Sequence, residues 1–268
     1  MSGQLPPQDR PLAGCTIVIT RPAGTGATLA RHVMACGGIP LLLPGLSLRA
    51  VSDAKTARAQ WQEAQRDDVL IFTSPAAVRY ATALSPLATQ ATVVAVGQGT
   101  ARALRRLGIE VQVPSARHDS EGLLDLPWLQ QPHGRRIALI TAPDGRGLLQ
   151  EQLVARGALL REVHVYRRVA PKLGPRHIDA VERMPNSACV LLSSAEAMQH
   201  LLVLLPPAAR QRLCDARVIA SSDRIAERAR ISGFSRVYVA ESAAPADLLA
   251  RACEVCSPPR HEASRSGC

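Results

Sequence analysis

The sequence predicts an α/β fold in which two similar parallel-sheet domains, of the flavodoxin or Rossmann-like kind, are joined by a two-stranded β connection. Apolar strand-like runs alternate with helical segments, which is typical of a parallel sheet with right-handed crossovers. Segment 135–168 repeats the strand, turn, helix and strand that open the chain. With 268 residues, 47% of them hydrophobic, the chain is long and apolar enough for two cores.

The repeat consists of four pairs of similar segments that follow one another in the same order. Both tetrads of the first pair read Ile-Thr-x-Pro, and both members of the second pair are apolar strands that end in two hydroxyl residues. The pairs are 19–22 with 140–143, 69–78 with 190–198, 93–108 with 217–233, and 120–126 with 245–251. We interpret them as two copies of one α/β domain.

The first copy opens with a strand at 17–20 and a helix that a glycine pair ends. The apolar run 40–44 has proline at both ends, which predicts an extended strand that connects the domains. A polar helix follows at 53–66, and its Trp61 is expected to pack inward. Strands are then predicted at 69–72, 93–96 and 111–113, with a helix at 99–107 before the last of them.

The second copy carries another proline-broken run at 169–171, directly after its first strand–helix–strand unit. The chain is therefore expected to leave one domain early and to return to it late. The expected boundaries are 12–43 and 169–255 for the discontinuous first domain, 47–164 for the inserted second domain, and 1–11 and 256–268 for disordered tails.

The net charge and the amino-acid composition indicate which classes of binding partner the protein could have. The net charge is +10 with a pI near 10.0, and arginine supplies nearly all of it, because Lys55 and Lys172 are the only lysines. This balance suits an anionic partner, either nucleic acid or a small polyacid, although a solvated arginine-rich surface would look the same. Aromatic residues make up only 3% of the chain, and there is no compact basic cluster, so we favour a polycarboxylate and expect no nucleic acid.

The compartment is predicted from what the chain lacks. The first dozen residues have no apolar core of a signal peptide, and no apolar run approaches the ~20 residues of a membrane-spanning helix. We expect a cytoplasmic monomer with free thiols that does not bind membranes. The seven cysteines do not pair by spacing, and the single C-x-x-C at Cys253 and Cys256 has no second pair, so neither a metal site nor a redox role is expected there.

Polar residues gather where the predicted strands end, and the carboxyl ends of parallel strands are where such sheets bind ligands. The candidate substrate-binding residues are Thr20, Arg21, Thr73, Ser74, Gly97, Thr100, Arg146, Ser193, Ser194 and Ser222. Serine and threonine at these places are also routine helix N-caps, so each of them singly could be only a cap. Together they predict two polar rims, one per domain, that face each other across a cleft.

No cofactor or metal is expected. Gly97-x-Gly99 is only a fragment of a dinucleotide fingerprint, and the chain has no Walker motif, no H-E-x-x-H and no G-x-S-x-G. An enzyme of this kind would act by placement, hydrogen bonding and a single acid. The candidate catalytic acid is Tyr166, which ends a predicted strand where the chain crosses between domains. The alternative is a half-buried structural aromatic with its hydroxyl in water.

Across roughly residues 14–252 the sequence resembles the uroporphyrinogen-III synthases. The residues that carry the resemblance are V-I-T-R-P at 18–22, F-T-S-P-A-A-V at 72–78, V-G-Q-G-T-A-R-A-L at 96–104, Gly145-Arg146, Gly157-Ala158, V-Y-R at 165–167, S-D-R-I-A at 222–226 and Leu248-Leu249. The order and spacing of these short motifs make the resemblance specific.

The resemblance implies two α/β domains joined by a two-stranded ladder, and a lyase of heme and porphyrin biosynthesis that needs no cofactor. Such an enzyme removes the hydroxyl of hydroxymethylbilane to give an azafulvene-type cation. Ring closure through a spiro intermediate then inverts the last pyrrole ring and yields uroporphyrinogen III. The eight carboxylates of the substrate suit an arginine-rich chain. Tyr166 would assist loss of the hydroxyl, and Thr100 would line the cleft.

A different class of function stays open at this point. A cytosolic two-domain protein that binds or senses a small anion would have the same architecture and the same arginines, and fold analogy alone does not separate it from an enzyme. The two differ in their products, because only the enzyme turns hydroxymethylbilane into the type III isomer.

Overall fold

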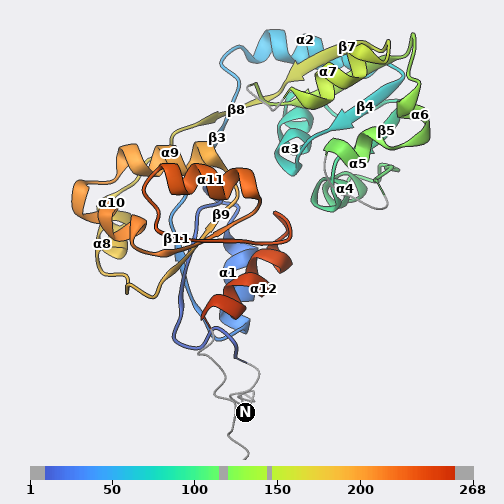
Figure 1. Cartoon of the computed structure of the whole chain (residues 1–268). Helices are drawn as coiled ribbons and strands as arrows, with labels where there is room; N and C mark the ends of the chain where they lie inside the picture. The colour runs from blue at the N-terminus through green and yellow to red at the C-terminus, as the bar shows by residue number, and fades with distance from the viewer. Residues whose placement is uncertain (1–9, 115–119, 144–146, 257–268) are drawn as a thin grey trace, which may run out of the picture. The chain divides into compact units, whose positions relative to one another are not determined.

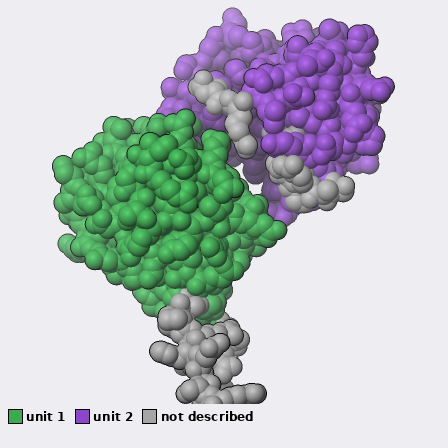
Figure 2. Space-filling model, viewed as in Figure 1, with its two compact units in different colours: residues 1–47, 170–268 green, residues 48–169 purple. Residues whose placement is uncertain are grey.

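The computed structural model describes residues 10–114, 120–143 and 147–256. The chain divides into two compact units (Figure 2). Unit 1 consists of Met1–Ser47 and Ala170–Cys268, and unit 2 is the continuous segment Leu48–Val169.

Unit 1 contains a five-stranded sheet in which all neighbouring strands are parallel. In spatial order its strands are β11 (Arg236–Val239), β10 (Arg217–Ala220), β9 (Cys189–Leu192), β1 (Thr16–Ile19) and β2 (Ile39–Leu42). Its helices are α1 (Ala27–Ala35), α8 (Pro175–Glu182), α9 (Ala195–Leu204), α10 (Pro207–Cys214), α11 (Asp223–Ile231) and α12 (Pro245–Cys256). Figure 1 shows α1 and α12 together on one face of the sheet.

Two cores enclose this sheet because successive strand residues point to opposite faces. Val190 and Leu192 pack with residues of α8 to α11 on one face. Cys189 and Leu191 pack with residues of α1 and α12 on the other face. The central strands are therefore buried along their whole length, as expected for a parallel sheet covered on both sides.

Unit 2 has the same plan on a smaller scale. Its parallel strands, in spatial order, are β5 (Thr92–Ala95), β4 (Val69–Phe72), β6 (Arg136–Thr141) and β7 (Leu159–His164). Its helices are α2 (Ala54–Ala64), α3 (Pro75–Leu84), α4 (Gln98–Arg105), α5 (Ser120–Leu124), α6 (Pro127–Gln130) and α7 (Leu148–Ala155). In place of the strand expected at 111–113, the structure has a single parallel bridge between Val94 and Gln112.

The helix expected at 53–66 is α2, and its Trp61 packs inward as predicted. The Trp61 side chain is fully buried, and its Nε1–H donates to the carbonyl of Ser85 at 3.1 Å. Asp53 begins the helix by accepting hydrogen bonds from the N–H groups of Lys55 and Thr56.

The two sheets reproduce the sequence repeat, but each unit combines parts of both copies. Strands β4 and β5 of unit 2 correspond to β9 and β10 of unit 1, and β6 and β7 correspond to β1 and β2. Unit 2 therefore joins the second part of the first copy to the first part of the second copy. Unit 1 takes the remaining two parts, which is why it is discontinuous.

The predicted β connection is confirmed, although its strands differ from those expected. β3 (Ser47–Ala50) pairs antiparallel with β8 (Tyr166–Val169) where the chain passes between the residue ranges of the two units. The apolar run at 40–44 instead supplies β2. Pro40 is tolerated there because β2 is an edge strand, where a missing N–H breaks no ladder.

At the ends of the described chain, Leu12 is buried in unit 1 and α12 continues to Cys256, one residue into an expected tail. The remaining tail residues, 1–9 and 257–268, lie outside the described residues. None of the helices in the described part of the chain has the length and apolar character needed to cross a bilayer.

Gly45, between β2 and β3, gives a prediction about packing. A Cβ at this position would lie 2.5 Å from the Cβ and 2.7 Å from the carbonyl oxygen of Ala197 in α9. Because backbone cannot move aside cheaply, we expect Gly45→Ala to destabilise the fold by about 1–3 kcal/mol in thermal and denaturant unfolding.

Gly99→Ala is the matched control. Its new Cβ would make an ordinary 3.6 Å contact with Pro75, and alanine is the better helix former within α4. Its free energy of unfolding should change by less than about 0.5 kcal/mol or rise. Equal losses in the two variants would contradict the close approach of Gly45 to α9.

Candidate functional site

The middle residues of the central strands β1, β4 and β9 are apolar, so the candidate polar side chains stand where these strands end. In unit 2 the carboxyl end of β4 leads into Thr73 and Ser74, and that of β5 leads through Val96 to Gly97. In unit 1 the ends of β1, β9 and β10 are adjacent in the sheet. Each unit therefore has its own group of candidate residues at one edge of its sheet.

Tyr166, the first residue of β8, lies at the carboxyl edge of unit 2. Its ring packs in the same core as Phe72 and Ile140 and is only 6% exposed. Its hydroxyl lies 3.1 Å from Oγ of Ser74, at the start of α3. The Tyr166 ring therefore belongs to the core of unit 2. Its hydroxyl lies beside the Ser74 hydroxyl at the carboxyl ends of the strands, and not in water alone as the structural alternative expected.

Tyr80 is a residue that the sequence analysis did not find. Its ring stacks on that of Tyr166, with centroids 5.5 Å apart and planes 14° from parallel. The Tyr80 hydroxyl donates to the carbonyl of Leu48 in β3 at 2.8 Å, and the Arg79 guanidinium lies 4.7 Å from the centre of its ring. Tyr80 thus connects α3 to both strands of the β3–β8 sheet and fixes the plane of the Tyr166 ring.

Ser74 is both a helix cap and the partner of Tyr166. Its Oγ accepts from the N–H of Ala77 at 3.0 Å, and Pro75 follows it at the first helical position. A hydroxyl has one proton and two lone pairs, so Ser74 can cap α3 and still donate to the Tyr166 oxygen. Next to it, Oγ1 of Thr73 lies 3.1 Å from Oγ1 of Thr141 at the end of β6.

Gly97 and Thr100 stand at the start of α4. Gly97 is the extended residue before the helix, and no side chain caps the N–H groups of this end. Thr100 is 3% exposed, and its N–H donates to the Gly97 carbonyl at 3.0 Å. The first turn of α4 thus lacks a side-chain cap, and an uncapped helix N-terminus suits an anion.

In unit 1, Thr20 and Arg21 follow β1. Thr20 is 3% exposed, and its Oγ1–H donates to the Leu191 carbonyl at 2.8 Å, so its proton is used to tie β1 to β9. The Arg21 guanidinium donates from Nη2 to the carbonyl of Ala243 at 3.1 Å. Its Nε is buried without a hydrogen-bond partner.

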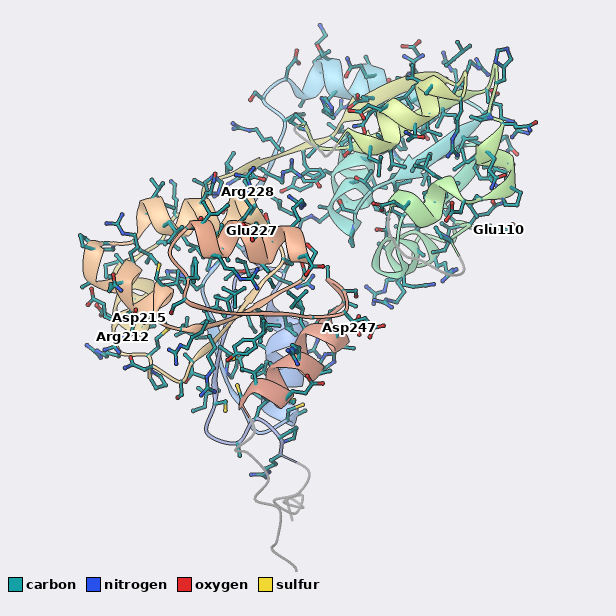
Figure 3. The ribbon with its side chains drawn as sticks, viewed as in Figure 1. Glu110, Arg212, Asp215, Glu227, Arg228 and Asp247 are labelled. Atoms are coloured by element: carbon teal, nitrogen blue, oxygen red, sulfur yellow. The ribbon has the colours of Figure 1, made fainter. Side chains whose placement is uncertain are left out.

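Arg21 is a cation without an acidic partner in the described part of the chain. Partial burial lowers the pKa of its guanidinium below the ordinary arginine value. Asp247, labelled in Figure 3 at the start of α12, accepts a hydrogen bond from the Ser242 hydroxyl. Arg21 therefore keeps a positive charge that no acidic side chain among the described residues compensates, which favours anion binding over a purely structural role.

The remaining candidates of unit 1 are serines after β9 and β10. Ser194 caps α9 by accepting from the N–H of Ala197 at 3.2 Å, and Ser222 caps α11 by accepting from the N–H of Ile225 at 3.4 Å. Ser193, between β9 and its cap, is partly exposed. Arg146, with Gly145, lies outside the described residues.

The structure thus brings the candidates together in two separate groups. Thr20, Arg21, Ser193, Ser194 and Ser222 follow three neighbouring strands of unit 1. Thr73, Ser74, Gly97, Thr100 and Tyr166 surround the edge of unit 2. That the two rims face each other stays a prediction. Within the described residues, no group of three or more His, Cys, Asp or Glu side chains could hold a metal ion.

The sequence of the chain matches one protein family over most of its length. The family model described as "Uroporphyrinogen-III synthase HemD" matches residues 27–250. The chain is 31% identical over 251 residues to the uroporphyrinogen-III synthase of Salmonella typhimurium, which covers 88% of this chain and 99% of that protein. It is also 31% identical over 257 residues to the uroporphyrinogen-III synthase of Escherichia coli, with the same coverage.

Solved structures agree in fold. The uroporphyrinogen-III synthetase of Helicobacter pylori superposes with a TM-score of 0.58 over 90% of this chain and 99% of its own, at 14% sequence identity. A mutant uroporphyrinogen III synthase of Thermus thermophilus gives a TM-score of 0.57 with the same coverage, at 22% identity. At these identities the likeness bears on the fold alone.

Proposed function

The chain belongs to the uroporphyrinogen-III synthase family, and we propose from this premise that it closes hydroxymethylbilane into uroporphyrinogen III, inverting the last pyrrole ring and releasing water. Among the observations on the site, the Tyr166 hydroxyl carries this proposal. It is held on a core-anchored ring at the polar edge of unit 2, beside a serine that can donate to it.

Tyr166 acts as the acid that helps the substrate hydroxyl to leave. The ring nitrogen of the hydroxymethylpyrrole pushes out the leaving group, so a weak acid suffices. A tyrosine hydroxyl carries a proton that it can give to the departing oxygen.

Ser74 positions this proton and supports its loss. One lone pair of Ser74 accepts the Ala77 N–H, so the serine proton is directed away from the helix and is available to the Tyr166 oxygen at 3.1 Å. The Tyr166 proton then points outward, and the serine hydrogen bond strengthens as negative charge develops on the phenol oxygen. Tyr80 holds the ring at the angle this requires.

Arg21 binds a carboxylate of the substrate. Its guanidinium carries a positive charge that no acidic side chain among the described residues compensates, which suits a charge-assisted hydrogen bond to a carboxylate, and partial burial makes that bond stronger than at a free surface. The N-terminus of α4, which no side chain caps, is a second place for a carboxylate.

The comparisons give no support to the alternative of a small-anion binding or sensor protein, since the matching family model and the relatives in Salmonella typhimurium and Escherichia coli are named as uroporphyrinogen-III synthases. We retain a monomeric state and a cytoplasmic location as parts of the proposal.

Analysis of the cyclised product tests the proposed function. Incubation of the protein with hydroxymethylbilane should give mainly the type III isomer, whereas the spontaneous reaction gives the type I isomer. The reaction should proceed unchanged after exhaustive chelation, since no metal site is proposed. A product ratio equal to that of the spontaneous reaction would refute the assignment, and loss of turnover restored by a divalent ion would refute the metal-free mechanism.

Replacing the acid should slow chemistry without unfolding the protein. We expect Tyr166→Phe to lower kcat by roughly 10- to 1,000-fold, the low end applying if water replaces the donor. The ring stays in place, so the free energy of unfolding should fall only by the contribution of one hydrogen bond, about 0.5–1.5 kcal/mol. Tyr238→Phe, on β11 of unit 1, is the control and should keep full activity. A wild-type kcat in Tyr166→Phe would remove this residue from the mechanism.

Arg21 gives a prediction with a salt dependence. Arg21→Gln should raise KM about tenfold or more, because a charge-assisted hydrogen bond is worth about 1.5–3 kcal/mol. The ratio of mutant to wild-type KM should shrink as salt screens the wild-type charge. Arg31→Gln, an exposed arginine of α1, is the matched control and should leave KM unchanged. An unchanged KM with lowered thermal stability in Arg21→Gln would make the residue structural.

A further inference from the structure

Five of the cysteines meet in one place in unit 1, although their spacing in the sequence shows no pairing. They belong to the apolar cluster between the sheet and the face covered by α1 and α12, and they are Cys15, Cys36, Cys189, Cys253 and Cys256. The sixth described cysteine, Cys214, packs against the opposite face of the sheet. The five come from four segments of the chain: the residue before β1, the end of α1, the start of β9 and the last turn of α12.

One pair within this cluster is in direct contact. The sulfur atoms of Cys189 and Cys256 lie 3.3 Å apart, and 67 residues of sequence separate them. Cys189 is fully buried at the first position of β9, whereas Cys256 is partly exposed at the end of α12. Such a pair has one thiol that a solution oxidant can reach and one that it cannot.

A hydrogen bond from the strand next to Cys189 keeps the end of α12 in place over this contact. Arg217, the register partner of Cys189 on β10, donates from Nη1 to the Val255 carbonyl at 3.1 Å. The last turn of α12 is thereby fixed over the beginnings of two neighbouring strands, with a cation at its carboxyl end. Cys15 is a competitor in this corner, because its sulfur lies 3.8 Å from the Cys256 carbonyl oxygen.

We propose that Cys189 and Cys256 form a reversible oxidation site, at which a peroxide converts the two thiols into a disulfide that links β9 to α12. The inference rests on the thiol contact and is independent of the proposed synthase activity. It revises the expectation, drawn from spacing alone, that the C-x-x-C at 253 and 256 has no redox role. The disulfide partner of Cys256 is Cys189 and not Cys253, its neighbour in that motif.

The chemistry divides the two thiols by role. Contact with the Cys189 thiol lowers the pKa of Cys256 to about 6, so at neutral pH Cys256 is mostly thiolate. The same contact and burial raise the pKa of Cys189. The pKa of Cys15 is raised to about 11, chiefly by burial, which keeps that competitor protonated. Cys256 is therefore the attacking sulfur and Cys189 the resolving one.

The step balances with hydrogen peroxide as oxidant. The Cys256 thiolate attacks one peroxide oxygen, the S–O bond forms, the O–O bond breaks, and hydroxide leaves, giving a sulfenic acid. Cys189 then attacks the Cys256 sulfur, the S–S bond forms, and the sulfenic oxygen leaves as water with the Cys189 proton. Two sulfurs are oxidised and one peroxide is reduced. The sulfurs must close from 3.3 Å to about 2.05 Å, which the last residue of a helix allows.

The experiment uses the full chain with Cys268→Ser, because Cys268 lies outside the described residues and could compete. Treatment with one equivalent of hydrogen peroxide should lower the intact mass by about 2 Da, and a dithiol should restore it. Peptide mapping should link 189 to 256. The thermal midpoint of the oxidised protein should rise by about 5 °C or more, because the crosslink closes a long loop. Cys253→Ser, one turn earlier on α12, is the matched control and should behave identically.

Cys256→Ser should abolish the mass loss, and its folding is not in question because the side chain is partly exposed. The other thiol is removed in Cys189→Ser, or in Cys189→Ala if the serine variant fails to fold. Without the Cys189 thiol, the pKa of Cys256 measured by alkylation should rise from near 6 toward the ordinary value near 8.5. A link from Cys256 to Cys15 or Cys253, a link only between molecules, or oxidation that stops at the sulfenic acid would each overturn the assignment.

Discussion

The structure depends on short parallel strands that are buried on both faces. β1, β4 and β9 are four residues each and have no exposed side chain. Such strands offer their edges to other strands and both faces to helices, which leaves only their ends for polar groups. The positions of the candidate residues that follow these three strands result from this constraint. Thr20, Ser74 and Ser194 each stand within two residues of a strand end, and the two serines also begin the next helix.

At those ends, folding and chemistry use the same atoms. Ser74 satisfies the first turn of α3 with one lone pair and meets Tyr166 with the rest of its hydroxyl. Thr20 shows the opposite outcome, because its proton is used for the Leu191 carbonyl and little of the side chain is exposed. A residue that looks like a cap in the sequence therefore needs its remaining hydrogen-bonding capacity examined before it is assigned to structure or to function.

Local pattern was enough to predict the strands β4, β5 and β6, the repeat and the polar strand ends, because these depend on neighbours in the sequence. It did not predict contacts set by the tertiary fold. Ser74 and Tyr166 are 92 residues apart, and the stack of Tyr80 on Tyr166 requires α3 to pack on β8. The pairing of Cys189 with Cys256 was hidden for the same reason. The strands that connect the domains lie a few residues from their predicted positions. Pro40 suggested that the run 40–44 leaves the sheet, whereas this run supplies the edge strand β2, which accommodates a proline.

The exchange of parts between the two repeat copies has a consequence for biosynthesis. Unit 2 is continuous, so all four of its strands have emerged once residue 164 has left the ribosome. Unit 1 must wait, because β1 lies between β2 and a strand, β9, that is made 150 residues after β2 ends at residue 42. At usual elongation rates this delay is roughly 7–30 s. During that interval a nascent β1–β2 pair presents an unpaired edge and an uncovered apolar face, which makes the newly synthesised chain, rather than the finished protein, the form most in need of a chaperone.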